Sequence, residues 1–325
     1  MKAREIHLRG PQTQALNAAC RRHSAGDFER DPAPVAGVVA AALGELLDPP
    51  QHAALAAYGT GDADVLIVRR GPRPEALGPT PRDGAAPSGD WSVGPLFLAG
   101  IMAAVGLRPV AYDSENAGQL VRHVLSRIGF EKTHSSHTGA AIGWHTESSD
   151  QPRYKAQDGV SPAPDALGFY ALRNPSKLPT TVVTVDTLEA ELAPDHWRAL
   201  QAPWFGFRCS DSHSHRRSTQ DIPLVVQRQG RWEMRYNQHT VMATDPRGED
   251  ALGALNRVLG QPELYAEVEL SEGDVALLDN HRILHGRAAI PEDALARWLV
   301  RLYGFAAATE GLRVAHGPSH VMKVA

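Results

Sequence analysis

The chain has 325 residues, 42% of them hydrophobic, and its 33 basic and 37 acidic side chains leave a formal net charge of -4. A chain of this length can bury a large core, while so even a charge balance excludes an extended basic surface for nucleic acid or an anionic membrane. Two cysteines are too few for a disulfide framework, and the sequence has neither an apolar signal segment nor a run of 18 apolar residues. We therefore expect an unprocessed protein of a reducing, cytoplasmic compartment, without nucleic acid or membrane partners.

The first third of the chain predicts helical cover and connections. Apolar residues from Val35 to Leu46 recur at helical spacing, and this amphipathic helix ends near Asp48-Pro-Pro50. Residues 64–68 form a short apolar run typical of a strand. Residues 69–92 are crowded with Pro and Gly, which predicts a long surface loop leading into a helical run at residues 93–105.

From about residue 109 the pattern changes to short strands with a helical insert. Apolar or alternating runs separated by Gly, Pro, Asn or Ser predict strands at 120–128, 140–144, 166–172, 181–185, 204–208, 222–227, 232–236, 264–270 and 275–278. Helices are predicted at 188–200 and 250–259. Many short strands at this spacing favour a β-sandwich or barrel over a parallel sheet.

Two separated segments carry candidate metal ligands. His145 and Glu147 stand two residues apart after an apolar run, and alternate side chains of a strand share a face, so both can point at one metal. His285 follows an apolar strand and a polar turn at residues 279–282. Two imidazoles and one carboxylate form the facial set that holds non-haem Fe(II) and leaves positions open. Either fragment alone is commoner as a surface or core feature, but their combination favours a metal site.

Two arginines follow on the next predicted strand. Arg297 and Arg301 are four residues apart in an alternating apolar stretch, so they face the same side if the segment is extended. Guanidinium groups bind carboxylates in a two-pronged geometry that lysine cannot match. The pair therefore predicts that two carboxylates bind beside the metal.

Three motifs occur in order: His145-Thr-Glu147, then Asp-Asn-x-x-x-x-His-Gly-Arg at residues 279–287, then Arg297-Trp-Leu-x-Arg301. In this combination the chain resembles the clavaminate synthase-like branch of the taurine dioxygenase superfamily, the Fe(II)/2-oxoglutarate oxygenases. The resemblance implies a β-rich α+β fold with a double-stranded β-helix (jelly-roll) core and flanking helices. It implies one catalytic domain, residues 1–325, in which residues 1–110 are mainly helical cover and residues 110–310 form the core.

The resemblance also implies the cofactor sites. His145, Glu147 and His285 would bind Fe(II), and Arg297 would hold the far carboxylate of 2-oxoglutarate with help from Thr181. Thr181 is equally well explained as a β-branched strand residue. With O2 as the second cosubstrate, 2-oxoglutarate would give succinate and CO2 while an unactivated C–H bond is hydroxylated. The carboxylate of Glu147 favours hydroxylation over halogenation, because a halide needs that coordination position vacant.

The substrate implied by the resemblance is a small polar molecule, in this branch a free α-amino acid or a derivative. Arg301 would meet its α-carboxylate, unless it is an ordinary ion-paired strand arginine. Related arginine hydroxylases clamp a guanidinium with acidic residues where this chain has Asn237 and His239, which speaks against a strongly cationic side chain. No glutamine for the α-ammonium group aligns near Arg122, since Gln119 is out of register.

Other interpretations stay open from the sequence. The same cofactor chemistry gives desaturation or cyclisation in some enzymes, because the outcome depends on where the substrate C–H bond lies. Two histidines and a glutamate also hold zinc in hydrolases, and a jelly-roll can be a non-catalytic binding protein. His213 and His215 could bind a second metal and His134 and His137 could touch substrate, although surface loops are the plainer interpretation of both pairs.

Overall fold

The computed structural model describes residues 1–130, 135–155, 157, 161–208, 219–306 and 320–324. His134, His213 and His215 lie outside these ranges. Of the helices within them, none has the length and apolar character that crossing a membrane requires.

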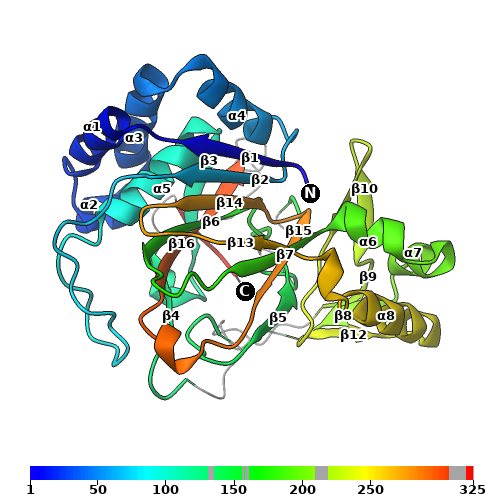
Figure 1. The fold of residues 1–325 in the computed structure, drawn as a ribbon. Helices are drawn as coiled ribbons and strands as arrows, with labels where there is room; N and C mark the ends of the chain where they lie inside the picture. Colours follow the sequence, from blue (N-terminus) through cyan, green and yellow to red (C-terminus); the bar gives the residue numbers. More distant parts are fainter. Residues whose placement is uncertain (131–134, 156, 158–160, 209–218, 307–319, 325) are drawn as a thin grey trace.

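A large sheet forms one layer of the core, with strand order β1-β2-β14-β6-β16-β3-β17 and β4 paired to β16 (Figure 1). Its strands are β1 (Ala3–His7), β2 (Val65–Arg69), β3 (Leu107–Tyr112), β4 (Arg122–Leu125), β6 (Ala166–Arg173), β14 (Val275–Asp279), β16 (Trp298–Ala306) and β17 (Val321–Met322). The pairs β1–β2 and β3–β17 are parallel and the others are antiparallel. The sequence did not reveal β1, which has mostly exposed side chains, so the first third of the chain supplies strands as well as helices.

A smaller antiparallel sheet of order β13-β7-β15-β5 forms the second layer. Its strands are β5 (Ile142–His145), β7 (Thr180–Thr184), β13 (Ala266–Val268) and β15 (Ile283–Arg287). Val182 and Ile283 belong to one buried cluster with Phe169 and Leu299 of the large sheet. Alternate side chains of both sheets thus fill the space between them, giving the predicted jelly-roll core with flanking helices.

The N-terminal helices cover the outer face of the large sheet (Figure 1). They are α1 (Gly10–Cys20), α2 (Ala25–Arg30), α3 (Pro32–Leu46), α4 (Pro49–Gly59) and α5 (Val93–Ala104). The predicted helix α3 ends before Pro49, and α5 matches the helical run predicted after the Pro- and Gly-rich loop. α5 is buried nearly all round because it lies between α3 and the sheet. Gly100 permits this approach, since a Cβ there would come within 2.2 Å of the Val39 side chain.

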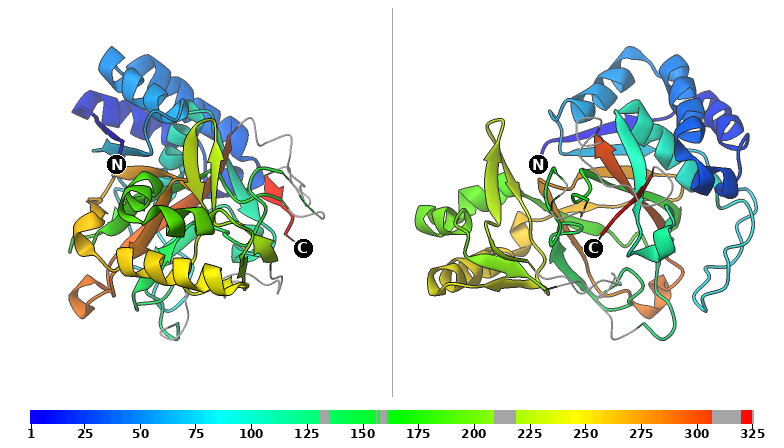
Figure 2. Two further views of the ribbon diagram at one scale, coloured as in Figure 1. Left: turned by 90° about the vertical axis from the view of Figure 1, so that its right-hand side faces the viewer. Right: turned by 180° about the vertical axis from the view of Figure 1, so that it is seen from behind.

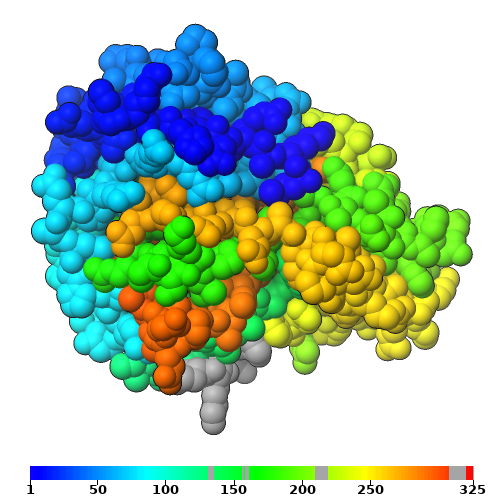
Figure 3. All heavy atoms as spheres, viewed as in Figure 1, coloured from blue at the N-terminus to red at the C-terminus, as the bar shows by residue number. Residues whose placement is uncertain are grey.

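An insert between β7 and β13 packs against the outer face of the small sheet and forms a lobe at the opposite end of the core from the N-terminal helices (Figures 2 and 3). It contains α6 (Val185–Glu191), α7 (Pro194–Leu200), β8 (Phe205–Phe207), β9 (Thr219–Ile222), β10 (Val225–Arg228), β11 (Arg231–Met234), β12 (Val241–Ala243) and α8 (Pro246–Val258). The single helix predicted at residues 188–200 is wrong. Pro194 has no N–H to continue α6, so it starts a second helix instead.

Candidate metal centre and active site

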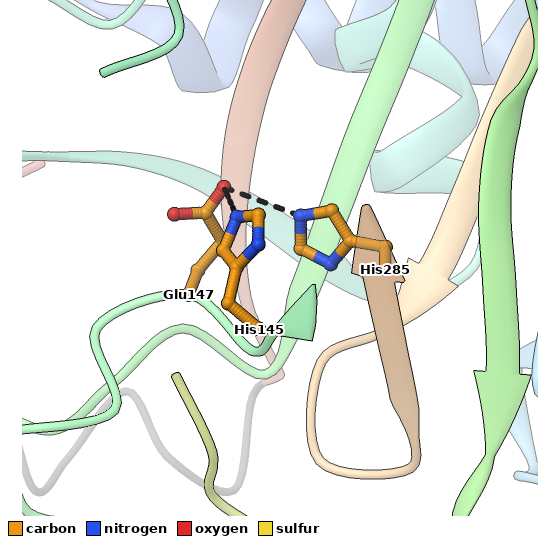
Figure 4. Close-up of side chains that lie close together, drawn as sticks. All are labelled: His145, Glu147 and His285. Atoms are coloured by element: carbon orange, nitrogen blue, oxygen red, sulfur yellow. Dashed lines mark ion pairs between the residues drawn. The ribbon is translucent and has the colours of Figure 1, made fainter. Parts of the chain in front are cut away.

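Three candidate ligands converge between the two sheets (Figure 4). His145 and His285 are directly opposite each other in the β5–β15 pair, and their ring centroids are 4.1 Å apart. The Glu147 Oε1 atom lies 3.9 Å from His145 Nε2 and 3.6 Å from His285 Nε2. Strand pairing therefore brings together two histidines that are 140 positions apart in the numbering.

Backbone groups orient the first two ligands. His145 Nδ1 lies 2.9 Å from the Gly143 carbonyl oxygen, which can only accept, so Nδ1 carries the proton and Nε2 keeps its lone pair for a metal. The Asn280 side chain accepts the Glu147 N–H at 2.8 Å and donates to the Glu147 carbonyl at 3.1 Å. It also donates to the Pro164 carbonyl at 2.8 Å. Asn280 therefore holds the backbone of Glu147 in place.

The Glu147 carboxylate is itself hydrogen-bonded. Arg301 Nη1 lies 3.1 Å from Oε1, and the Tyr303 hydroxyl lies 2.8 Å from Oε2. Glu115 completes the network, with its two oxygens 2.6 Å from Arg301 Nη2 and 3.0 Å from the Tyr303 hydroxyl. Burial raises the pKa of Glu147, but Arg301 and the two histidine ligands outweigh it and hold this pKa well below its usual range. The carboxylate is thus kept ionised.

The three side chains suit a divalent transition metal. Burial and the neighbouring His285 lower the pKa of His145 to about 4, so this imidazole is neutral at pH 7. Ligands bound at about 2.1 Å lie about 3 Å apart when their bonds form a right angle, and the observed separations are only slightly wider. Two imidazoles and one ionised carboxylate are the ligand set of the facial triad of Fe(II) oxygenases.

Arg301 lies on the interior face of β16, because Leu299 and Tyr303 alternate with outward residues and belong to the cluster between the sheets. Arg297 stands just before this strand, where its backbone N–H donates to the Ala294 carbonyl. Arg297 is only 3% exposed, yet within the described chain its Nε and Nη1 have no hydrogen-bond partner. Burial and the nearby Arg287 lower its pKa to about 9. A buried, unpartnered guanidinium is costly, so it marks a place for an anionic ligand.

The strand register changes the threonine expected beside Arg297. Val182 pairs with His285 and faces the interior, so Thr181 faces the other side, where its partner is the exposed Glu267. Thr180 is two residues from Val182, faces the interior and is buried. The sequence prediction named Thr181, but Thr180 and Thr184 are the threonines of β7 on the interior face, and the Thr184 hydroxyl caps α6.

The two predicted substrate residues differ in position. Asn237 forms an isolated antiparallel bridge with His145, which places it next to the metal ligands. His239 is exposed, and its backbone N–H donates to Asn237 Oδ1 at 3.0 Å. Asn237 therefore belongs to the wall of the site and His239 to its rim.

Sequence reasoning assigned no role to Asn280, Tyr303 or Glu115. Asn280 stood within the quoted Asp-Asn motif, and Tyr303 is two residues from Arg301 and so on the same face of β16. Glu115 lies before the short helix η1 (Asn116–Gly118), and no spacing in the sequence connects it with the ligands. Only the fold could identify it.

Comparison with known proteins now decides the family. Residues 98–303 match the model of the family described as taurine catabolism dioxygenase TauD, TfdA family. The chain belongs to this TauD/TfdA family. An enduracididine beta-hydroxylase of Streptomyces hygroscopicus is 24% identical over 278 residues, which cover 75% of this chain and 77% of the relative.

Solved structures share the fold of this TauD/TfdA protein. The non-heme iron oxygenase OrfP in complex with Fe and alpha-ketoglutaric acid has a TM-score of 0.80 and 23% identity, covering 99% of this chain and 100% of that one. An asparagine oxygenase in complex with Fe(II), 2S,3S-3-hydroxyasparagine and succinate has a TM-score of 0.78 and 19% identity, covering 99% of both chains.

Membership of the TauD/TfdA family confirms the enzyme class predicted from the sequence, a 2-oxoglutarate-dependent non-haem iron dioxygenase. The family disfavours both the zinc hydrolase and the non-catalytic binding protein.

Proposed function

We propose that this TauD/TfdA-family dioxygenase hydroxylates an unactivated C–H bond of a free α-amino acid or a close derivative. The observation that carries the proposal is the convergence of His145, Glu147 and His285 next to the strand that begins after the unpartnered Arg297. Relatives named for amino acids, an enduracididine beta-hydroxylase and an asparagine oxygenase, support the substrate class.

In this proposal His145, Glu147 and His285 hold the ferrous ion. The bound iron, with 2-oxoglutarate and O2, supplies the oxidising power for C–H cleavage and yields succinate and CO2. The Gly143 carbonyl holds the His145 proton at Nδ1, so its Nε2 is available to the metal, and Arg301 helps to keep the Glu147 carboxylate ionised.

The cosubstrate is assigned to Arg297. Its free N–H donors suit a two-pronged contact with the far carboxylate of 2-oxoglutarate, and its burial strengthens that contact by excluding water. We assign the assisting hydroxyl to Thr180 in place of Thr181, because Thr180, unlike Thr181, faces the interior.

The substrate's α-carboxylate is assigned to Arg301. This guanidinium has five N–H donors, and the contacts with Glu115 and Glu147 occupy two of its nitrogens through one donor each. Glu115, the acid beside Arg301 that is not a metal ligand, offers acceptors to an α-ammonium group. Asn237 and His239 complete this proposed substrate wall and rim.

The N-terminal third is included in one catalytic domain, residues 1–325, because β1 and β2 lie in the same sheet as β14, β6 and β16. A cytoplasmic setting is part of the proposal, since ferrous iron and the free thiol of Cys20 both persist under reducing conditions.

The test is a screen of free amino acids and small carboxylates with Fe(II), ascorbate and 2-oxoglutarate. Substrate-dependent succinate together with a product heavier by one oxygen is the expected result. A product lighter by two hydrogens would establish desaturation or ring closure instead. Failure of every compound to increase succinate formation above the substrate-free rate would contradict the amino-acid assignment.

A further inference from the structure

Arg235 has no role in the reaction described so far. It stands two residues before Asn237, which forms an isolated antiparallel bridge with the metal ligand His145. Tyr236 between them is buried in the outer cluster with the insert helices. Because side chains alternate along an extended segment, Arg235 and Asn237 point to the side of His145.

A second arginine lies directly beside it. The Leu224 carbonyl accepts both the Arg153 Nη2 donor at 2.9 Å and the backbone N–H of Arg235 at 2.9 Å. The Arg153 side chain is 11% exposed, and its Nη1 is 3.7 Å from the Glu233 carboxylate, too far for a hydrogen bond. The same Glu233 oxygen already accepts the hydroxyl of Tyr154. The Arg153 side chain therefore contacts the same carbonyl as the Arg235 backbone, and its positive charge is close enough to act on the Arg235 guanidinium.

Both arginines and the segment just before Arg153 contain buried polar atoms without partners. Within the described chain, Arg153 Nη1, Arg235 Nε, the Ser148 hydroxyl and both amide atoms of Gln151 are buried without a hydrogen-bond partner. No ion pair or side-chain hydrogen bond joins Arg235 to any described residue. Burial and Arg153 lower the pKa of Arg235 to about 9, against an opposing effect of Asp150. Leaving such donors unpaired in the interior is costly unless a ligand supplies acceptors.

We propose that Arg153 and Arg235 bind a carboxylate or similar oxyanion at the end of the substrate's side chain. The inference rests on the proposed function and narrows it to amino acids with an anionic side chain. A cationic side chain would be repelled by both guanidinium groups, and no acid stands at Asn237 or His239 to receive it. The oxyanion would accept hydrogen bonds from the two arginines, and Gln151 and Ser148 lie in the same segment as Arg153.

The first test compares matched ligands on the wild-type enzyme loaded with Fe(II) and 2-oxoglutarate under anaerobic conditions. Calorimetry measures the affinities for L-aspartate, L-glutamate and L-2-aminoadipate against L-asparagine, L-glutamine, L-arginine and L-lysine. A charge-assisted hydrogen bond contributes about 1.5–3 kcal/mol, so we expect at least one acid to bind at least about tenfold more tightly than its amide. L-Cysteate and O-phospho-L-serine show whether a sulfonate or phosphate replaces the carboxylate.

The outcomes separate the two proposals. If no acid binds more tightly than its amide, or if a basic amino acid binds best, the side-chain inference is overturned whatever the turnover. Succinate formation with an amide or basic amino acid alone would overturn the inference and keep the proposed hydroxylase. Selective binding of an acid without succinate formation by any compound would contradict the proposed function and keep the anion site.

Variants test which residues cause the preference for an anionic side chain. Arg235→Gln should weaken binding of the preferred acid at least about tenfold and bring its affinity close to that of the amide, while 2-oxoglutarate affinity stays unchanged. Arg153→Gln should act in the same direction, and Arg235→Lys should retain part of the preference. The control is Arg247→Gln, an exposed arginine over Trp204 in the insert. Equal acid-to-amide ratios in Arg235→Gln and the control would refute the site, and the wild-type panel decides the question if the variant fails to fold.

Discussion

The two ends of the Arg297–Arg301 segment bury the same chemical group in opposite ways. Arg301, in the middle of β16, contacts the carboxylates of Glu115 and Glu147. Arg297, just before the strand, has two guanidinium nitrogens without a partner in the described chain and sits near another cation, Arg287. Both arginine side chains are buried, so burial alone does not show which arginine supports the metal site and which binds a ligand. The satisfied Arg301 supports a metal ligand and has only its remaining N–H donors for the substrate, whereas Arg297 has unpartnered donors for the cosubstrate.

The difference also predicts opposite responses to substitution. Removing one partner from a buried ion pair leaves charge uncompensated, whereas removing an uncompensated charge takes away a cost of folding. Arg301 should therefore matter to the folded state without any ligand, and Arg297 should matter only when 2-oxoglutarate is present.

The largest effect is expected from loss of the metal ion, whose ligand Glu147 is held by Arg301. His285→Ala deletes a ligand, and because loss of a supporting residue alone costs about 10–100-fold in metal affinity or activity, turnover should fall by more than about 100-fold. Iron content and succinate formation measure the loss, and circular dichroism checks the fold. The matched control, His196→Ala, changes a histidine on α7 paired with Asp250 and should keep both iron and turnover. Normal iron content in the His285 variant would remove this residue from the triad.

The next effect tests Arg301 as a supporting residue. Arg301→Met leaves Glu115 and Glu147 buried without their cation, so the free energy of unfolding should decrease by about 3–5 kcal/mol. Urea denaturation of the metal-free protein measures it. If the double change Arg301→Met with Glu115→Gln restores no stability, the pairing with Glu115 contributes nothing.

A smaller effect concerns the cosubstrate. Arg297→Met should weaken 2-oxoglutarate binding by about 10–100-fold, through loss of a charge-assisted contact, while metal-free stability changes by less than about 1 kcal/mol or increases. Titration of 2-oxoglutarate into the iron-loaded protein provides the measurement. Arg297→Lys keeps the charge without the planar geometry and should fall between the two. A variant that is destabilised as much as Arg301→Met would abolish the contrast between the two arginines.

The smallest effect concerns the contact between His123 and Trp298, the residue that follows Arg297. Trp298 Nε1 donates to His123 Nδ1 at 3.1 Å, and burial followed by Arg122 lowers the pKa of His123 from 6.5 to about 4. Between these two values the unfolded chain binds a proton that the folded chain does not, so stability should fall as pH decreases, by at most about 1.4 kcal/mol per pH unit. Denaturation at pH 7, 6, 5 and 4 should show a shallower dependence in His123→Gln. An unchanged slope in that variant would assign the dependence to other groups.

The sequence was informative where chemistry imposes a local pattern. The paired ligands His145 and Glu147, the third histidine and Arg297 were visible as motifs. The prediction that both paired ligands lie on one strand was wrong, because β5 ends at His145 and Glu147 lies in the turn that follows. Thr180 and Thr181 could not be separated in this way, since a shift of one residue reverses the face of a strand. Glu115 was invisible for a different reason: its contact with Arg301 spans 186 residues and depends on the fold alone.

The Asn280 side chain accepts the Glu147 N–H and donates to the Glu147 carbonyl, which ties that residue to the β14–β15 turn, 133 residues away. The turn between β14 and β15 therefore fixes the position of the carboxylate ligand. The residues that follow Glu147 are not the ones that hold it. Residues 148–155, which include Arg153, follow a ligand whose backbone is held from the β14–β15 turn. Changes in this segment can therefore alter substrate preference while the metal ligands stay in place.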